Sequence, residues 1–176
     1  AELTQAIVNK IVDLALVEGD GTNGFKSIEK ETDVKKIKKI TTKAKKAGET
    51  PFADAIEEAV DFVRPTAGRR YLIVKAEDRK ALLDELRQAT ANAHVRIKND
   101  DTEIASEVVV DEIIVYTGTK AVKPTVLVDQ KYHIDMQDIT KVDAFEWKTN
   151  SNMILVETLT SGHVETYNAG AVITVA

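Results

Sequence analysis

Cysteine is absent from the sequence, and its absence excludes disulfides, thiolate metal ligands and a cysteine nucleophile. Long apolar runs are absent too, because no stretch approaches the roughly 20 apolar residues that a membrane-spanning helix needs. The first residues lack the basic and then apolar pattern of a secretory signal. With 43% hydrophobic and 30% charged residues among 176, the composition is that of an ordinary globular protein. We therefore expect one compact core, or two small ones that share a long element, and no membrane partner.

Motifs for catalysis are missing as well. The sequence has no G-x-S-x-G nucleophile elbow. The glycine-rich run from Gly19 to Gly24 lacks the preceding strand and the GK[ST] ending of a phosphate-binding loop, so we interpret it as a turn. The acidic cluster of Glu57, Glu58 and Asp61 falls on the polar face of a predicted helix, where water solvates the carboxylates. We predict that the protein is not an enzyme and holds no cofactor.

The best candidate for a metal site is the pair His133 and Asp135, with Asp138 nearby, because residues two apart in a strand share a face. The same alternation assigns three larger side chains to the buried face of this strand: Tyr132, Ile134 and Met136. The pair is therefore predicted to be a polar pair on the wet face, with no metal bound. The other two histidines fall in a predicted loop and a predicted turn, at His94 and His163.

The apolar spacing predicts a helix over residues 3–19. Leu3, Ile7, Ile11 and Leu14 follow one another at intervals of four, four and three, which places them on one stripe of a helix. The Gly19-Asp20-Gly21 sequence then ends the helix abruptly, because glycine accepts positive φ.

The rest of the chain changes from helical to strand-like periodicity. A helix is predicted over 52–63 after Thr50 as N-cap and Pro51 at the first helical position, and a second helix over 76–89. Residues 90–106 are predicted to be an exposed loop with some strand character at Val95 and Ile97. Strands are predicted at 71–74, 108–110, 113–116, 126–128, 132–136, 153–160, 164–167 and 171–175, with a turn at 149–152. This order predicts an α+β fold that ends in a β-meander.

Positive charge is concentrated between residues 26 and 46, where nine lysines face three acidic residues for a net charge of +6, which leaves −11 on the rest of the chain. Val34, Ile37, Ile40 and Ala44 are spaced three, three and four apart, which predicts an amphipathic helix over 34–46 with a basic outer face. This face is either a patch that contacts a polyanion such as a nucleic acid, or a solvated surface. The candidate residues are Lys35, Lys36, Lys38, Lys39, Lys43, Lys45 and Lys46.

The ordered set of features resembles the major capsid protein of tailed phages or prophages, the Hong Kong 97 fold. The turn from Leu16 to Thr22 is similar to the end of that family's spine helix. The strand and helix from Tyr71 to Leu86 are similar to part of its axial domain, and the segment from Val156 to Val175 is similar to its closing strands.

The resemblance implies an axial α/β lobe at 32–111 and a peripheral lobe that joins the spine helix and turn, 1–31, to return strands and a hairpin, 112–176. It implies a structural head protein that associates with copies of itself in pentamers and hexamers around a phage genome, in a virion capsid assembled in the host cytoplasm. Portal and scaffold partners are not identified. The family's N-terminal arm and extended loop have no counterpart in these residues. An encapsulin-like compartment shell and a non-enzymatic α+β binding module are the alternatives.

Overall fold

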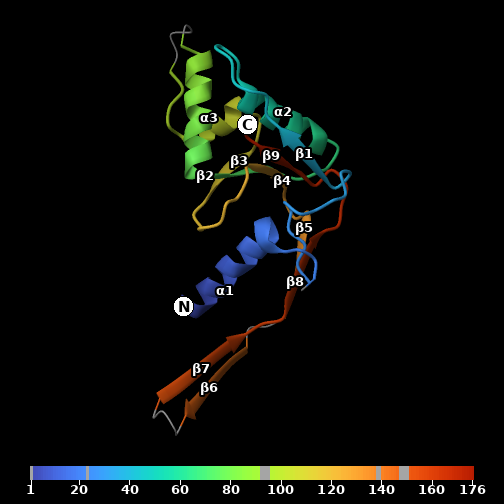
Figure 1. Ribbon diagram of the computed structural model, residues 1–176, viewed down its shortest axis with the longest axis vertical. Helices are drawn as coiled ribbons and strands as arrows, with labels where there is room; N and C mark the ends of the chain where they lie inside the picture. The colour runs from blue at the N-terminus through green and yellow to red at the C-terminus, as the bar shows by residue number, and fades with distance from the viewer. Residues whose placement is uncertain (1, 23, 92–95, 138–139, 147–150) are drawn as a thin grey trace.

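A computed structural model describes the chain except for residues 1, 23, 92–95, 138–139 and 147–150, and it does not describe the side chains of Leu3 and of residues 140–157. Figure 1 shows two regions: a body made of a sheet with helices against it, and a narrow arm that runs away from the body. The helix at the start of the chain lies below the sheet, on the side opposite the other helices.

A five-stranded mixed sheet forms the centre of the body. From edge to edge its strands are β1 (Ile37–Thr41), β9 (Gly170–Thr174), β4 (Thr125–Val128), β2 (Arg70–Lys75) and β3 (Glu112–Tyr116). The pairs β1–β9 and β2–β3 are parallel, whereas β4 is antiparallel to both of its neighbours. The last strand of the chain therefore lies inside the sheet, between the first strand and the fourth.

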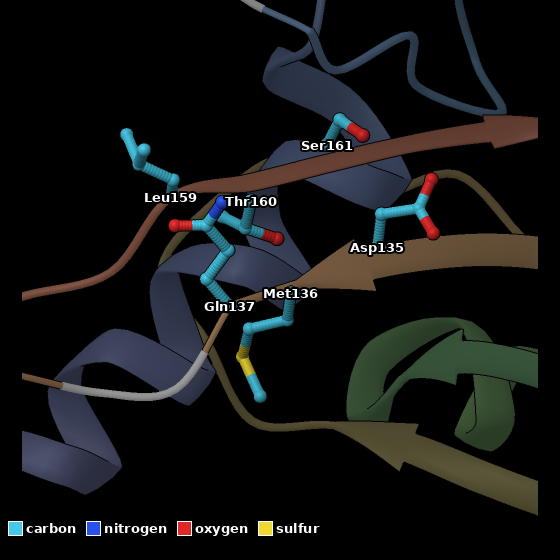
Figure 2. A pocket seen from close by; sticks show the side chains of 6 residues that line it. All are labelled: Asp135, Met136, Gln137, Leu159, Thr160 and Ser161. Carbon is cyan, nitrogen blue, oxygen red and sulfur yellow. The ribbon is translucent and has the colours of Figure 1, made fainter.

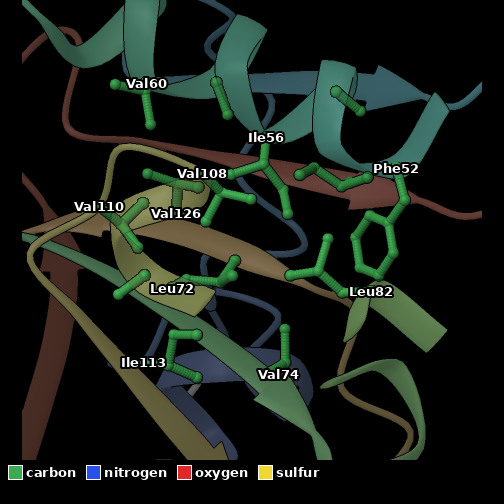
Figure 3. Packing of buried hydrophobic residues seen from close by; sticks show 14 of the residues in the cluster. Phe52, Ile56, Val60, Leu72, Val74, Leu82, Val108, Val110, Ile113 and Val126 are labelled. Atoms are coloured by element: carbon green, nitrogen blue, oxygen red, sulfur yellow. The ribbon is translucent and has the colours of Figure 1, made fainter. Parts of the chain in front are cut away.

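Three helices cover one face of the sheet: α2 (Pro51–Val63), α3 (Ala76–Ala89) and α4 (Asp101–Glu107). Figure 3 shows Ile56 of α2 and Leu82 of α3 directed at Leu72 and neighbouring sheet side chains. These three side chains are fully buried, and each contributes about 1.5–3 kcal/mol through removal of apolar surface from water. The helices predicted over 52–63 and 76–89 and the strand predicted over 71–74 are confirmed.

The start of α2 is capped from outside the helix. Thr50 occupies the predicted N-cap position, but its hydroxyl bonds Asp54 rather than a backbone N–H. The buried carboxylate of Glu85, on α3, accepts instead from the backbone N–H of Phe52 at 3.1 Å and of Ala53 at 2.8 Å. A carboxylate suits this place because a helix N-terminus carries unpaired donors and partial positive charge.

The opposite face of the sheet packs on the first segment of the chain. The predicted helix is observed as α1 (Glu2–Asp13), followed by one turn of π-helix, η1 (Leu14–Glu18), which Gly19 closes by donating to Leu14 O at 3.0 Å. A Cβ at Gly19 would lie 2.7 Å from that oxygen, so the closure requires glycine. Leu16 and Ile28 are buried here against the sheet.

The arm consists of two successive antiparallel pairs. The strands β5 (Tyr132–Met136) and β8 (Thr160–Val164) pair at its base, and β6 (Thr140–Glu146) pairs with β7 (Ser151–Glu157) beyond them. The prediction of a meander is wrong, because these strands nest as one long hairpin, and β9 returns to the sheet instead of pairing with β8. Part of the turn predicted at 149–152 lies outside the described residues.

The predicted boundary between the axial lobe and the return strands, at residues 111 and 112, cuts through the central sheet. It places β3, β4 and β9 in a peripheral lobe, whereas these strands pair with β1 and β2 in one sheet. The reason is that β4 lies between β2 and β9, so the return segment completes the sheet that the earlier strands begin. Among the described residues of 112–176, the strands that lie outside that sheet are β5 to β8.

The region predicted to be loop and strand between 90 and 110 contains a short helix, α4. Asp100 begins the helix by accepting from Thr102 N, and Val95 lies outside the described residues. The predicted strand 108–110 is wrong, because these residues cap the helix: Val109 N donates to Ser106 O and Val110 N to Ala105 O. This is a Schellman motif, in which Val109 takes a φ of 59°.

We predict that Val109→Gly stabilises the protein by about 0.5–1 kcal/mol. A β-branched residue at positive φ costs about 1–2 kcal/mol, and the extra freedom of glycine in the unfolded chain offsets part of that gain. Val109 is 64% exposed, so the substitution removes little packing. The urea midpoint should rise at constant m-value. Val109→Ala, which keeps the strain, is the control, and a lower midpoint for Val109→Gly than for Val109→Ala would contradict the assignment.

Candidate functional site

The lysine-rich segment is not a helix. Residues 34–36 form a turn, β1 follows, and residues 42–46 are in neither helix nor strand. Ile37 packs on the α1 side of the sheet and Ile40 on the α2 side, both almost completely buried. Residues three apart in a strand point to opposite faces. The spacing that predicts a helix is therefore produced by a strand that is buried on both faces, and the predicted amphipathic helix over 34–46 is wrong.

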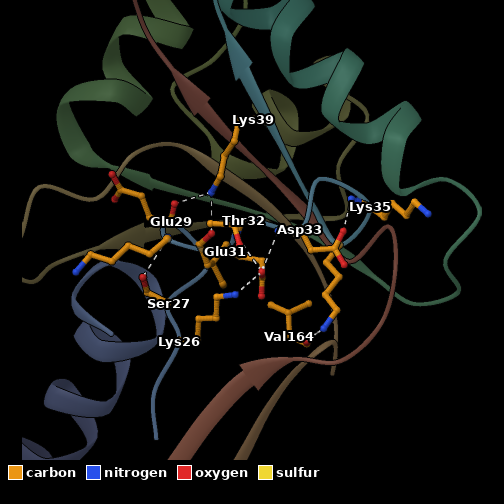
Figure 4. A network of polar contacts seen from close by, with 12 residues as sticks. Lys26, Ser27, Glu29, Glu31, Thr32, Asp33, Lys35, Lys39 and Val164 are labelled. Carbon is orange, nitrogen blue, oxygen red and sulfur yellow. Dashed lines mark hydrogen bonds and ion pairs between the residues drawn. The ribbon is translucent and has the colours of Figure 1, made fainter. Parts of the chain in front are cut away.

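Two of the seven candidate lysines hold the fold together. Lys36 Nζ donates to the backbone oxygen of Val164 at 2.9 Å, and Lys39 Nζ donates to those of Ile28 and Glu29 at 2.9 and 2.6 Å (Figure 4). Burial lowers the pKa of the Lys39 ammonium, and Glu29 opposes this effect. Lys36 is half-buried and Lys39 is exposed, and the ammonium groups of both donate to carbonyl oxygens within the protein.

A third lysine of the set pairs with a neighbouring helix. Lys38 Nζ lies 2.7 Å from Glu58 Oε1 and 5.9 Å from the centre of the Phe62 ring, and both partners belong to α2. The four remaining candidates are exposed and are called here the exposed lysine set: Lys35, Lys43, Lys45 and Lys46. The predicted continuous patch is thus reduced to this smaller set.

A buried carboxylate organises the loop that leads into β1. Glu31 Oε1 accepts from Lys26 Nζ at 2.7 Å and from the backbone N–H groups of Thr32 and Asp33 at 2.9 and 3.0 Å (Figure 4). Burial acts to raise the pKa of Glu31, but Lys26 and these N–H groups hold it below its ordinary value. In the sequence Glu31 looks like one more surface charge, and no local signal distinguishes it.

A second cluster fixes the first helix to the body. Glu18 pairs with Lys10 and with Lys120, whose Nζ lies 2.5 Å away in the loop between β3 and β4. These two lysines lower the pKa of Glu18 to about 2. The hydroxyl of Tyr116 at the end of β3 donates to Asp13 at the end of α1. Because α1 lies beneath the sheet, these contacts and the apolar side chains of η1 set its position.

The pair His133 and Asp135 is observed, with His133 Nε2 3.0 Å from Asp135 Oδ1. The assignment of Ile134 and Met136 to a buried face is wrong, since they are 43% and 53% exposed. The cause is that β5 belongs to a two-stranded pair rather than to the central sheet. His163 lies in β8, not in a turn, and stands directly opposite His133. Asp138 and His94 lie outside the described residues.

The two remaining candidate groups are the glycine-rich turn and the acidic cluster of α2. The turn predicted after Gly19 is observed in its described residues: Asp20 Oδ1 accepts from Thr22 N at 2.9 Å, and Gly21 N donates to Phe25 O at 2.7 Å. The acidic cluster of α2 is exposed, as expected. Among the residues that the structure describes, no three His, Asp or Glu side chains are placed to hold one metal ion. In the same part of the chain, no helix has both the length and the apolar character needed to cross a bilayer.

Comparison with known proteins places these features in context. No protein-family model matches the chain. All 176 residues align at 94% identity with the capsid proteins of Lactococcus phage p2 and Lactococcus phage SK1, and the chain spans 45% of the length of each. Among solved structures, the capsid of an empty GTA particle matches 99% of this chain and 65% of its own, with a TM-score of 0.59 and 13% identity. This chain has the Hong Kong 97-type capsid fold.

A second solved capsid agrees. The procapsid of satellite phage P4, in the structure that includes its size determination protein, matches 99% of this chain and 62% of its own, with a TM-score of 0.53 and 12% identity. The capsid fold class inferred from the order of sequence features is therefore confirmed. The capsid fold provides the body and the arm described above; it does not by itself assign a role to the exposed lysine set.

Proposed function

We propose that this chain is the shell-building part of a phage major capsid protein. Many copies associate into pentamers and hexamers, which close into an icosahedral shell around the genome in the host cytoplasm. The observation that carries this proposal is the 94% identity over every residue to two phage capsid proteins, combined with the capsid fold. The role is structural and not enzymatic.

The geometry suits assembly by repetition. Two apolar clusters pack the two faces of the central sheet, so each copy of the body can enter the shell as a rigid unit. The arm is formed by strand pairs that are each two strands wide. Two-stranded pairs are marginally stable alone and present unpaired backbone groups along their outer edges. Contacts of the arm with neighbouring copies satisfy those edges, and weak contacts repeated around closed symmetry axes accumulate into a stable lattice.

The exposed lysine set is proposed to face the packaged genome. Its four ammonium groups belong to the one segment of strong positive charge in a chain whose net charge is −5. Lysines without interleaved aromatic or arginine side chains favour contact with phosphates irrespective of base sequence. Lys36, Lys38 and Lys39 are left out of this proposal because their ammonium groups bond within the protein.

Protein mass spectrometry and cryo-electron microscopy of purified particles test the shell proposal. Peptides of this chain should belong to the most abundant protein of DNA-filled particles, and the shell density should contain the capsid fold in rings of five and six. Particles that enclose protein cargo and no nuclease-resistant DNA would support an encapsulin-like compartment instead. Absence of the chain from the shell would contradict the proposal.

Titration of duplex DNA at two salt concentrations tests the role of the exposed lysine set. Replacement of all four lysines by Gln should weaken binding at low salt at least about tenfold and reduce the salt slope by about one for each phosphate that the variant no longer neutralises. The control replaces four other exposed cationic side chains by Gln: Arg64, Lys80, Arg96 and Lys98. Equal weakening in the two variants would show that only net charge matters, and it would contradict the assignment to this segment.

A further inference from the structure

Two histidines face each other at the base of the arm. His133 of β5 and His163 of β8 are direct cross-strand partners, and their ring centroids lie 6.0 Å apart with the planes at 67°. Their side chains are 49% and 46% exposed, so both rings are accessible from solvent. No local pattern in the sequence indicates this pairing, because the two residues belong to opposite sides of a long hairpin.

Each imidazole also has its own carboxylate. His133 Nε2 lies 3.0 Å from Asp135 Oδ1, and His163 Nε2 lies 3.4 Å from Glu165 Oε1. A carboxylate that accepts from one ring nitrogen fixes the tautomer and makes the other nitrogen a better metal ligand. The hydrogen bond to Asp135 therefore leaves Nδ1 of His133 as its metal ligand. Glu165 lies close to Nε2 of His163 without a hydrogen bond, so Nδ1 is also the open nitrogen of that ring.

The separation of the rings matches a shared ion. With a Zn–N bond of about 2.0–2.1 Å, an imidazole centroid lies about 3.2 Å from the metal. Two imidazoles on one ion then have centroids about 5.2 Å apart at a tetrahedral angle and about 6.4 Å apart when opposite. The observed 6.0 Å lies between these limits. Both side chains are about half exposed, so each has room to rotate its ring toward a shared ion.

We propose that His133 and His163 together bind a divalent transition-metal ion of the zinc, copper or nickel class. Imidazole is a preferred ligand of these ions, whereas calcium and magnesium prefer oxygen. The protein supplies two ligands, and water completes the coordination, in agreement with the lack of a preformed three-ligand group among the described residues. Asp135 also lines an open hollow of about 460 Å³ with Ser161 and Gln137 (Figure 2), so the surroundings of this carboxylate are open to solvent.

The consequence is a metal link across the base of the arm. The ion joins β5 to β8 where the hairpin leaves the body. An ion that binds the folded chain and not the unfolded chain raises the free energy of unfolding. The site contains no residue of the exposed lysine set.

Isothermal titration of the tag-free chain with Zn²⁺ near neutral pH tests the proposal. The wild type should bind one ion. His163→Asn should weaken binding at least about tenfold, and Asp135→Asn should weaken it about tenfold through the loss of the supporting carboxylate. His94→Asn is the matched control, because it removes the third histidine of the chain and should leave binding unchanged. Ca²⁺ in place of Zn²⁺ should give no comparable binding.

Imidazole NMR signals of the wild type provide a readout that does not depend on variants. Zn²⁺ should shift the signals of His133 and His163 together and leave those of His94 in place. Equal zinc affinity of wild type and His163→Asn would overturn the proposal. Calcium binding as tight as zinc binding, or a zinc-induced shift of one histidine without the other, would also overturn it.

Discussion

The position of β9 in the central sheet is the constraint on which the rest of the structure depends. This strand forms a parallel ladder with β1 and an antiparallel ladder with β4. Ala171 and Ile173 point into the helix-covered core, and Val172 points into the core beneath the sheet. One strand of five residues thus joins the two apolar clusters. Gly170 allows this close approach, since a Cβ there would lie 2.7 Å from Val126 O.

The arm and the first helix are attached to this sheet by different means. The arm leaves after β4 and returns to β9, so the sheet determines where its two ends lie. The first helix has no strand partner and is positioned by the apolar side chains of η1 and by polar groups that reach across, above all Glu18 and Asp13. Lys36 and Lys39 also donate to backbone oxygens of the segments beneath the sheet. This is why a segment that looks like a continuous binding surface in the sequence is partly involved in holding the fold together.

The sequence predicts the body's covering helices and several of its sheet strands well. The helices α2 and α3 and the strand β2 lie close to their expected bounds, and the capsid fold follows from the order of such elements. The sequence misleads in β1, which is buried on both faces, since Ile37 and Ile40 there have the spacing of a helix. It also misleads in β5, where alternation predicts a buried face that a two-stranded pair does not have. The anchoring of Lys36 by Val164 and the pairing of His133 with His163 join residues distant in the chain, so no local pattern predicts them.

Urea unfolding of a chain that ends at Ala169 tests the central role of β9 most directly. The account predicts that removal of residues 170–176 abolishes cooperative unfolding, because it opens the sheet between β1 and β4 and exposes both apolar clusters. A chain that lacks only Val175 and Ala176 keeps all of β9 and should retain a cooperative transition close to that of the full chain. Cooperative unfolding of the shorter chain at the midpoint of the full chain would contradict the account.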